Sequence, residues 1–325
     1  MKKSLLVMLV CLLTLSFSFT GLVQAKDFPT KPISIVCPWA AGGGTDRTAR
    51  FIAEQLSARL GQPVNVINKT GGAGAVGFSA GATAKADGYT LTNLTFEINT
   101  LKYLGYSDLT PQDYTPIIQF NEDASAVIVH AESAYATVKD LLEDIKAKPE
   151  GTFTFSGSSI GSVWDLARVG MLTGYGVDLN KVKYVPSQGA APAITELLGK
   201  HIDVITCSYP EAASQVEAGA LKALAVMADE RNPQFDQIPT LKEQGIDFSY
   251  GTWRGFALPK NADADAAKVL IEAFQDIVAS EEFKAFMAKN GFGIKVRVGD
   301  EFMQFMMDQF NGLDEIIKLA GYGQQ

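Results

Sequence analysis

The chain has 325 residues, of which 47% are hydrophobic and 20% charged, with 28 Lys and Arg against 36 Asp and Glu. This composition is typical of a globular protein and excludes a disordered, collagen-like or disulfide-dense chain. The formal net charge of −8 argues against a nucleic-acid binder, because duplex binding needs clustered basic residues. Two histidines make a His-rich metal site or a His-dependent enzyme harder to build, and we expect no metal and no cofactor.

Residues 1–25 have the pattern of a cleavable signal peptide. A pair of lysines precedes an apolar stretch from Leu5 to Val23, which ends on the small-x-small pattern Val-Gln-Ala. A membrane anchor is the alternative, but no stop-transfer charges follow. We therefore expect cleavage after Ala25 and export to a bacterial periplasm. The leader charges are both basic, so the mature chain carries 26 basic and 36 acidic residues and a net charge of −10.

The mature chain begins with strands alternating with helices. Short β-rich runs predict strands at Ile33–Cys37, Val64–Ile67 and Tyr89–Leu94. Apolar residues at three- and four-residue spacing from Ala49 to Leu60 predict a helix, with Thr45 or Asp46 as its cap and Gly61 at its end. A second helix opens from Gly71–Gly77 and reaches about Lys85. Repeated β-α-β units of this kind predict parallel strands in an α/β sheet.

A second series follows an irregular stretch at Thr110–Pro116. Its predicted strands are Ala126–Val129, Thr152–Phe155, Lys183–Val185 and Val204–Thr206. Its predicted helices are Val138–Lys146, one from about Ser162, and Ala191–Leu198. The Leu224–Val226 run, a Pro-rich stretch at Asn232–Pro239 and the Trp253–Pro259 segment precede two amphipathic segments, Asp263–Ala279 and Asp300–Leu319. The economical architecture is two α/β lobes, residues 26–120 with 231–325 and residues 121–230.

Three glycine-rich loops are candidate functional elements. The first, Pro38–Asp46, lies between a strand end and a helix start, where backbone amides can hold an anion without a cationic side chain. The second, Gly72–Gly77, matches G-x-G-x-x-G with Glu97 twenty residues on. It follows the second strand rather than the first, and an exported protein meets little NAD. A helix-start loop lining the same cleft is therefore favoured over dinucleotide binding.

The third loop, Gly157–Gly161, matches the nucleophile motif G-x-S-x-G around Ser159. A serine hydrolase would then need an acid and a histidine further along, in that order. The downstream His201 stands directly before a predicted strand, and His130 lies upstream. A second Ser/Gly loop at a helix start, donating to the same ligand as the first loop, is favoured over a hydrolase.

The mature chain retains two cysteines, Cys37 and Cys207, which are 170 residues apart in sequence. Each lies in or directly after an apolar run that predicts a buried strand. An oxidising compartment permits a disulfide between them. We expect two unpaired buried thiols instead.

Several segments resemble the tripartite tricarboxylate transporter substrate-binding proteins, also called Bug receptors. The resemblance spans nearly all of the mature chain in the right order and spacing, and its N-terminal part is carried by Phe28–Ile33, Pro38–Asp46, Leu60–Val64, Asn68–Gly74 and Asp87–Leu91. Its later part is carried by Gly161–Ala167, Gly189–Ala193, Leu224–Val226, Pro239–Gly245 and Trp253–Pro259. It implies a type II periplasmic-binding-protein fold, with two α/β lobes closing on a central ligand cleft.

The resemblance implies a receptor that delivers a small organic acid to one large and one small integral membrane subunit, and we expect a monomer. Family members hold a ligand carboxylate between the first βα loop and the loop at residues 156–162, mainly through backbone amides and waters. The implied ligand-binding residues are Trp39, Ala40, Ala41, Gly42, Gly43, Gly44, Thr45, Asp46, Ser158, Ser159, Gly161, Ser162, Asp165, Gln188, Gly189 and Arg254.

Two departures from the family pattern concern the ligand. Many members have His at the position of Asp165, and Tyr-x-Gly where this chain has Ser187-Gln188-Gly189. An Asp in the pocket would repel a carboxylate, or could receive an amino group or cation. The alternative is that Asp165 complements the dipole of its own helix. Trp39 forms an apolar pocket wall or packs on the next helix, and Arg254 meets the ligand or forms a salt bridge elsewhere. An exported serine hydrolase using Ser159 and a sensor for a signalling system remain alternative functions.

Overall fold

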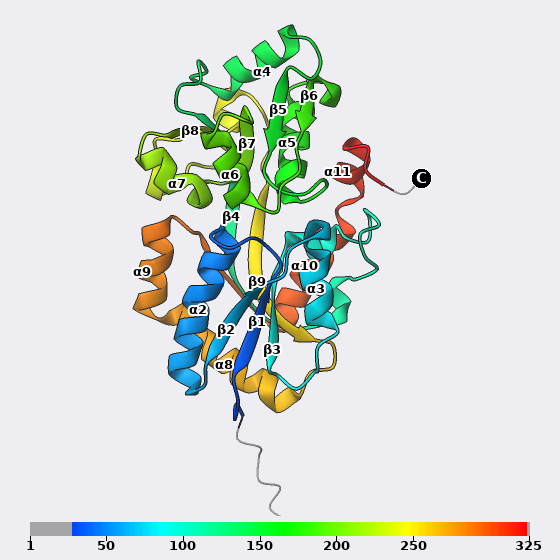
Figure 1. The fold of residues 1–325 in the computed structure, drawn as a ribbon, viewed down its shortest axis with the longest axis vertical. Coiled ribbons are helices and arrows are strands. Elements are labelled where there is room, and N and C mark those ends of the chain that lie inside the picture. The colour runs from blue at the N-terminus through cyan, green and yellow to red at the C-terminus, as the bar shows by residue number, and fades with distance from the viewer. Residues whose placement is uncertain (1–27, 324–325) are drawn as a thin grey trace, which may run out of the picture.

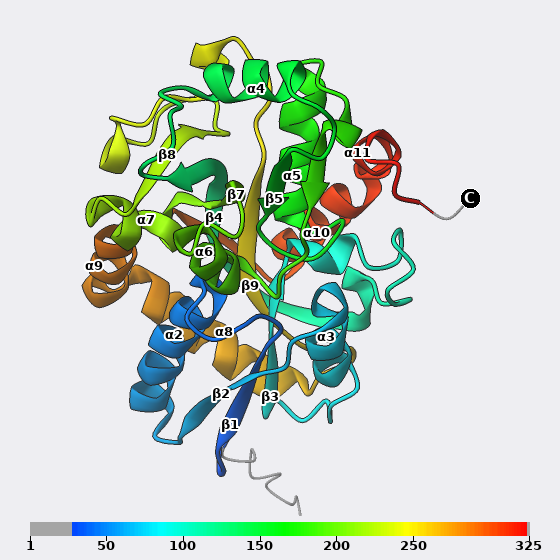
Figure 2. The same cartoon turned by 45° about the horizontal axis from the view of Figure 1, so that its top comes forward.

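The computed structural model describes residues 28–323, so the expected signal peptide at residues 1–25 lies outside the described residues. The chain forms two stacked α/β lobes that share one curled sheet, as Figures 1 and 2 show. The strands are β1 (Ile33–Cys37), β2 (Val64–Asn68), β3 (Thr90–Thr95), β4 (Tyr114–His130), β5 (Phe153–Ser156), β6 (Val182–Tyr184), β7 (Val204–Ser208), β8 (Leu221–Val226), β9 (Gly251–Pro259) and β10 (Ile294–Val298). The helices are α2 (Gly44–Leu60), α3 (Ala75–Ala82), α4 (Val138–Ala147), α5 (Val163–Gly174), α6 (Ala190–Leu198), α7 (Tyr209–Glu217), α8 (Ala264–Ala279), α9 (Glu281–Asn290), α10 (Asp300–Asn311) and α11 (Asp314–Leu319).

The sheet has the strand order β2-β1-β3-β9-β4-β7-β5-β6, and β4 also pairs with β8 and β10. We call the part built on β1–β3 and β10, with α2, α3 and α8–α10, lobe 1, and the part built on β5–β8, with α4–α7, lobe 2 (Figure 1). β1 runs parallel to β2 and β3, and β5 runs parallel to β6 and β7. The predicted β-α-β units and α/β class are therefore confirmed.

The helix α2 forms where the apolar spacing of the sequence predicts a helix. Its apolar stripe, including Ala49, Ile52 and Leu56, is fully buried, and Gly61 ends it in the left-handed conformation at φ 66°. The prediction that Thr45 or Asp46 caps it is wrong, because the helix already begins at Gly44 and its N-cap is Gly43. Its N-cap is a glycine with no side-chain hydrogen bond, which leaves the first amides of α2 free to bond elsewhere.

Two long strands, β4 and β9, pass through both lobes (Figure 1). β4 pairs with β9 up to Ala124, and from Ser125 onward it pairs with β7 and β8. The sequence pattern predicted just the last part of β4 and an irregular stretch at its start. The apolar sequence pattern of β4 is interrupted by Gln119, Asn121 and Asp123. These residues are polar but buried, whereas apolar residues are the ones that mark a buried strand in a sequence. The predicted lobe boundaries, near residues 120 and 230, stay a prediction.

The C-terminal region returns from lobe 1 to lobe 2. The predicted second amphipathic segment is two helices, α10 and α11, separated near Gly312, and α11 packs on α5 of lobe 2. Neither α7, α9 nor β10 was predicted. Figure 2 shows α11 beside α5, away from α8 and α2. No helix in residues 28–323 is long and apolar enough to cross a membrane.

The apolar core has three parts. One fills lobe 1 beneath α2 and α8, one fills lobe 2 between α4 and β5, and one joins the lobes through side chains such as Phe96, Trp164 and Trp253. The shared part means that the contact between the lobes is itself apolar and buried. Burial of apolar surface therefore favours the closed arrangement seen here.

Cys37 and Cys207 are free thiols, both fully buried, as predicted. Burial raises the pKa of Cys37 to about 12, and burial raises the pKa of Cys207 well above its usual value. Because the thiolate is the reactive form, neither residue should react with a thiol reagent at pH 8 in the folded mature protein. Titration with Ellman's reagent should detect two thiols after denaturation without a reductant. Fewer than two would indicate a disulfide.

Candidate functional site

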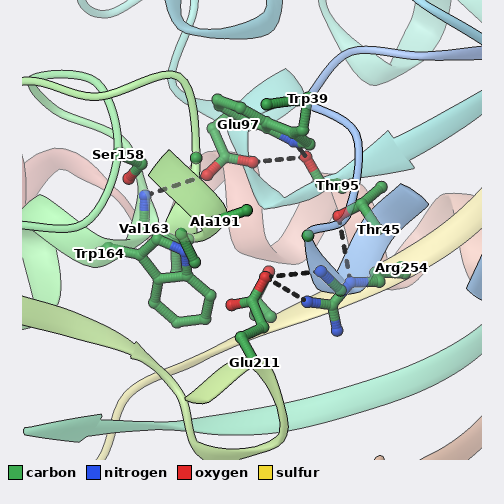
Figure 3. Close-up of a pocket in the computed structure, with 16 residues that line it drawn as sticks. Trp39, Thr45, Thr95, Glu97, Ser158, Val163, Trp164, Ala191, Glu211 and Arg254 are labelled. Atoms are coloured by element: carbon green, nitrogen blue, oxygen red, sulfur yellow. Dashed lines mark hydrogen bonds and ion pairs between the residues drawn. The ribbon is translucent and has the colours of Figure 1, made fainter. Parts of the chain in front are cut away.

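A small pocket lies between the lobes, where the starts of α2, α5 and α6 converge (Figure 3). It encloses about 20 Å³, close to the space for one water molecule. The lobes are thus closed on each other. The lining residues come from both lobes and are Trp39, Ala40, Gly43, Gly44, Thr45, Thr95, Glu97, Ser158, Val163, Trp164, Gly189, Ala190, Ala191, Glu211, Thr252 and Arg254.

The first glycine loop forms one wall of the pocket. The indole Nε1 of Trp39 donates to Thr95 Oγ1 over 3.1 Å, so this tryptophan is fixed as part of the wall. A Cβ atom on Gly44 would lie 2.7 Å from Arg254 Nη2, which explains the glycine at this position. The Gly44 amide, at the start of α2, donates to Glu211 Oε1 over 3.0 Å. The anion that this loop holds is therefore a side chain of the protein itself.

Glu97 is a second buried carboxylate of the pocket. It lies in a short 3₁₀ turn, Phe96–Asn99, directly after β3. Its Oε2 accepts from Thr95 Oγ1 at 2.5 Å, and its Oε1 accepts from the Val163 amide, at the start of α5, at 3.2 Å. Burial raises the pKa of Glu97, against the opposing effect of these hydrogen bonds. The carboxylate thus occupies an anion-binding helix start without a cationic partner among residues 28–323.

Glu211 is held by its own helix as well as by lobe 1. It is the third residue of α7, where Ser208 Oγ donates to its Oε2 over 3.1 Å, forming a capping box with the Ser208 amide. Its Oε1 faces Gly44 and lies 3.6 Å from Arg254 Nη2. The same side chain therefore begins α7 in lobe 2 and closes onto α2 in lobe 1.

Arg254, on β9, is buried and almost fully engaged. Its Nη1 donates to Asp123 Oδ2 over 2.6 Å and to Asn121 Oδ1 over 2.5 Å. Its Nε donates to Thr45 Oγ1 over 3.1 Å. Burial raises the pKa of Asp123, and the nearby guanidinium opposes that rise. Arg254 thus lines the pocket, and its charge is directed mainly at Asp123 behind the pocket wall.

The two glutamates make a reciprocal pair of contacts between the lobes. Glu97 of lobe 1 accepts from the start of α5 in lobe 2, and Glu211 of lobe 2 accepts from the start of α2 in lobe 1. Figure 3 shows both carboxylates at the pocket, with dashed lines leading from each. We call Glu97 and Glu211 the paired glutamates. They occupy the Gly44 amide of the first predicted loop and the Val163 amide, which directly follows the predicted loop at residues 156–162.

The structure brings half of the sequence-predicted site residues to this pocket. Those that line it are Trp39, Ala40, Gly43, Gly44, Thr45, Ser158, Gly189 and Arg254. Those outside the lining are Ala41, Gly42, Asp46, Ser159, Gly161, Ser162, Asp165 and Gln188. The glycine loop at Gly72–Gly77 is also outside the lining of this pocket, and its predicted place along the cleft stays a prediction. Whether any of these residues contacts a ligand stays a prediction.

Local hydrogen bonds explain why several predicted residues turn away. Burial opposes ionisation of Asp46, but bonds from Arg50, the Gly42 amide and Asn68 outweigh it and lower the pKa of the carboxyl. Gln188 binds across the cleft to Thr70, with 2.7 Å between the side-chain oxygens. These groups therefore support the loops that form the pocket walls.

The serines of the third loop bond within lobe 2. Ser162 donates its hydroxyl to the Ser159 carbonyl over 2.6 Å, and Ser158 and Ser162 share a hydroxyl contact. Ser159 donates to the Ser187 carbonyl over 3.4 Å. Their hydroxyls thus hold the loop at residues 156–162 in place against the segment that leads into α6.

Asp165 is engaged inside lobe 2 rather than at the pocket. Its Oδ1 lies 2.7 Å from Arg168 Nη2, and its Oδ2 accepts from the Gly161 amide over 2.9 Å. Both side chains are buried, with exposed fractions of 0% and 4%. The geometry therefore favours the structural role of Asp165 at its own helix start over contact with an amino group or a cation.

The geometry does not assemble a catalytic triad around Ser159. His201 bonds to Glu196 on the exposed side of α6, and His130 accepts from the Glu132 amide. Among residues 28–323, neither histidine is a hydrogen-bond partner of Ser159. The same described part of the chain contains no cluster of three or more His, Cys, Asp or Glu side chains arranged for a metal ion.

Sequence reasoning missed the paired glutamates as site residues. Glu97 stands out in the sequence through its spacing from the G-x-G-x-x-G motif, and Glu211 belongs to none of the three glycine-rich loops. A signal for Glu211 exists, because Ser208-Tyr-Pro-Glu211 is a capping-box pattern at the carboxyl end of a predicted strand. No comparable local pattern marks Glu97, whose partner amide belongs to the other lobe.

Residues 48–322 match the family model described as tripartite tricarboxylate transporter family receptor. The chain is 26% identical over 306 residues to Protein BugT of Bordetella pertussis, with 92% of each chain covered. It is 34% identical to a TctC solute-binding protein from Polaromonas solved with no ligand, with a TM-score of 0.65 and coverage of 90% of this chain and 99% of that one.

Three further solved structures share the fold. The periplasmic binding protein BugD is 27% identical, with a TM-score of 0.86 and coverage of 92% of this chain and 100% of that one. An R. palustris protein with adipate is 24% identical, with a TM-score of 0.85 over 91% and 99% of the two chains. MatC from Rhodopseudomonas palustris, with bound malate, is 22% identical, with a TM-score of 0.82 over 89% and 100%. The likeness to these last two is one of fold.

Replacing Arg168 by Met should destabilise the protein by about 3–5 kcal/mol, because it leaves the Asp165 carboxylate buried without its cation. The double variant Arg168→Met with Asp165→Asn should regain part of that loss, since the uncompensated charge is gone. Urea unfolding measures both. Lys284→Met, at an exposed ion pair, is the control and should change stability little. A double variant no more stable than Arg168→Met would contradict the ion-pair role.

Glu97→Gln should change the pH dependence of stability. Because burial raises the pKa of Glu97 in the folded state, the folded protein binds the extra proton, and its stability falls as pH rises above the ordinary value of 4.5. The free energy of unfolding of Glu97→Gln should therefore increase relative to wild type between about pH 4.5 and neutral pH. Urea titrations across this range measure the difference. Parallel pH profiles for the two proteins would contradict the assignment.

Proposed function

This chain belongs to the tripartite tricarboxylate transporter receptor family, and we propose that it is a periplasmic receptor that captures a small organic acid and delivers it to a tripartite membrane transporter. The observation that carries the proposal is the pocket between two closed lobes, at which three helix starts converge. Helix starts stabilise negative groups through free amides and the helix dipole, so a protein of net charge −10 still has local sites for an acid.

The proposed mechanism is binding by lobe closure. A pocket of about 20 Å³ is too small for an organic acid, so the lobes must part before a ligand enters. We assign the bending to β4 and β9, near the point where β4 exchanges its pairing partners between Ala124 and Ser125. The unliganded Polaromonas protein supports this mechanism, because it has higher identity than BugD but a lower TM-score. A different angle between the lobes would produce that combination.

The proposed ligand class is supported by chemistry as well as by similarity. Adipate and malate, held by two structures of the same fold, are small organic acids with two carboxylates. The transporter's large and small integral subunits are the proposed partners, and the expected signal peptide would deliver the chain to the periplasm. A sensor for a signalling system shares the fold. A hydrolase has less support, because Ser159 bonds to a backbone carbonyl and lacks a histidine partner among the described residues.

A screen of organic acids against the mature protein should find members that raise its melting temperature. Ligand at 100 times its dissociation constant stabilises the folded state by about 2.7 kcal/mol, which is readily measured. The hits should also change tryptophan fluorescence, because Trp39 and Trp164 line the pocket.

Two outcomes would contradict this proposal. One is a panel of organic acids in which no member shifts the melting temperature. The other is labelling of Ser159 by a fluorophosphonate together with ester turnover, which would support the hydrolase. An effect of a hit on transcription without uptake of that acid would instead support the sensor.

A further inference from the structure

We propose that the paired glutamates make this receptor selective for an organic acid that carries a protonated amine, and that they exclude plain dicarboxylic acids of the same length. This inference rests on the proposed function and names the ligand class of the same pocket. It follows from which helix starts are occupied, which is open, and where the positive charge of the pocket is directed.

Two of the three helix starts at the pocket already hold a carboxylate. The Gly44 amide at α2 donates to Glu211, and the Val163 amide at α5 donates to Glu97. A dicarboxylate that used these amides would have to displace both side chains. Each acid group of the ligand would then face a buried glutamate, and like charges in a desolvated site repel strongly.

The paired glutamates have little freedom to move out of the way. Glu97 is 2% exposed and is also tied to Thr95, while Glu211 is tied to Ser208 at the start of α7. Displacing Glu211 would break the capping box of that helix as well. The ligand therefore has to accommodate these carboxylates rather than replace them.

The third helix start is open to a ligand carboxylate. α6 is nine residues long, and its N-cap, Gly189, contributes no side-chain hydrogen bond. Gly189, Ala190 and Ala191 all line the pocket, and no side chain among residues 28–323 accepts from the Ala190 or Ala191 amide. The first amides of a helix lack partners within it, so these groups can receive the acid end of a ligand.

The positive charge near the pocket leaves Glu97 without an ion-pair partner among the described residues. The Arg254 guanidinium is bonded to Asp123, Asn121 and Thr45, and its Nη2 lies 3.6 Å from Glu211 Oε1. No cationic side chain within residues 28–323 forms an ion pair with Glu97. Arg47 directs its Nη2 to the Pro210 carbonyl. A ligand ammonium group would supply the cation that Glu97 lacks.

Two aromatic side chains favour the same ligand. Trp39 and Trp164 line the pocket, and Figure 3 shows Trp164 near Ala191 and Val163. Tryptophan faces attract cations, with greater strength in a desolvated site. An amino carboxylate matches this pocket. The glutamate carboxylates and the indoles would bind its ammonium group, and the α6 amides would bind its acid group.

The test compares acids that differ by one amine. Succinate and aspartate, glutarate and glutamate, and adipate and 2-aminoadipate each form a matched pair, and melting shifts and calorimetric titrations with the mature wild-type protein measure their binding. For the pair of the right length, we expect the amino member to bind at least tenfold more tightly than the plain acid. This comparison needs no variant, so it tests the proposal whether or not the variants fold.

Variants of the paired glutamates test whether these two residues cause the preference for an amine. Glu97→Gln and Glu211→Gln keep the size and an acceptor oxygen while removing the charge, and each should reduce the preference for the amine at least tenfold. Glu196→Gln is the matched control, because this glutamate pairs with His201 on an exposed face of α6, away from the pocket. It should keep the wild-type preference.

Each outcome has a distinct meaning. Equal or tighter binding of the plain acid by wild type would overturn this inference and leave the receptor function intact, since it would mean that ligand carboxylates displace the paired glutamates. An amine preference that survives in both folded glutamine variants would also overturn it. If no acid of either kind binds, the proposed function itself fails, and the inference fails with it.

Discussion

A buried carboxylate needs partners, and in this protein each of two pocket carboxylates finds one in the opposite lobe. Glu97 and Glu211 both accept from the first amides of a helix across the cleft. A helix start is a favourable site for an anion, and water is largely excluded from the closed pocket. These two contacts join the lobes at the pocket, in addition to the apolar core that the lobes share.

Further hydrogen bonds hold the residues around the paired glutamates in place. Arg254 lies between Asp123 and Thr45 and so links the strands shared by the lobes to the start of α2. Thr95 lies between Trp39 and Glu97 and links the pocket wall to the carboxylate. A network in which each buried polar group has a partner resists local rearrangement. A ligand therefore meets charges in fixed positions, which favours selectivity.

Sequence patterns predicted the regular part of this structure and one wall of its pocket. Local signals predicted β1 and α2. They are the β-rich residues up to Cys37, the apolar spacing that starts at Ala49, and the glycine at Gly61 that ends the helix. Most of β4 escaped prediction because Asn121 and Asp123 owe their burial to Arg254 and to the Gly293 backbone, far away in sequence. Glu97 was not predicted as a site residue, because its hydrogen-bond partner is also far away in sequence. Its role exists only once α5 of the other lobe is placed beside it.

The path of the C-terminal segment limits how the lobes move relative to each other. α10 packs on lobe 1, while α11, a few residues later, packs on α5 of lobe 2. The chain between them is short and contains Gly312, so it permits rotation more readily than separation. Sliding or pulling apart would detach α11 and expose the apolar side chains of Leu313 and Ile317 to water. Bending at β4 and β9 that keeps the α5–α11 contact intact avoids this exposure, so the cleft would open most at the points farthest from that contact.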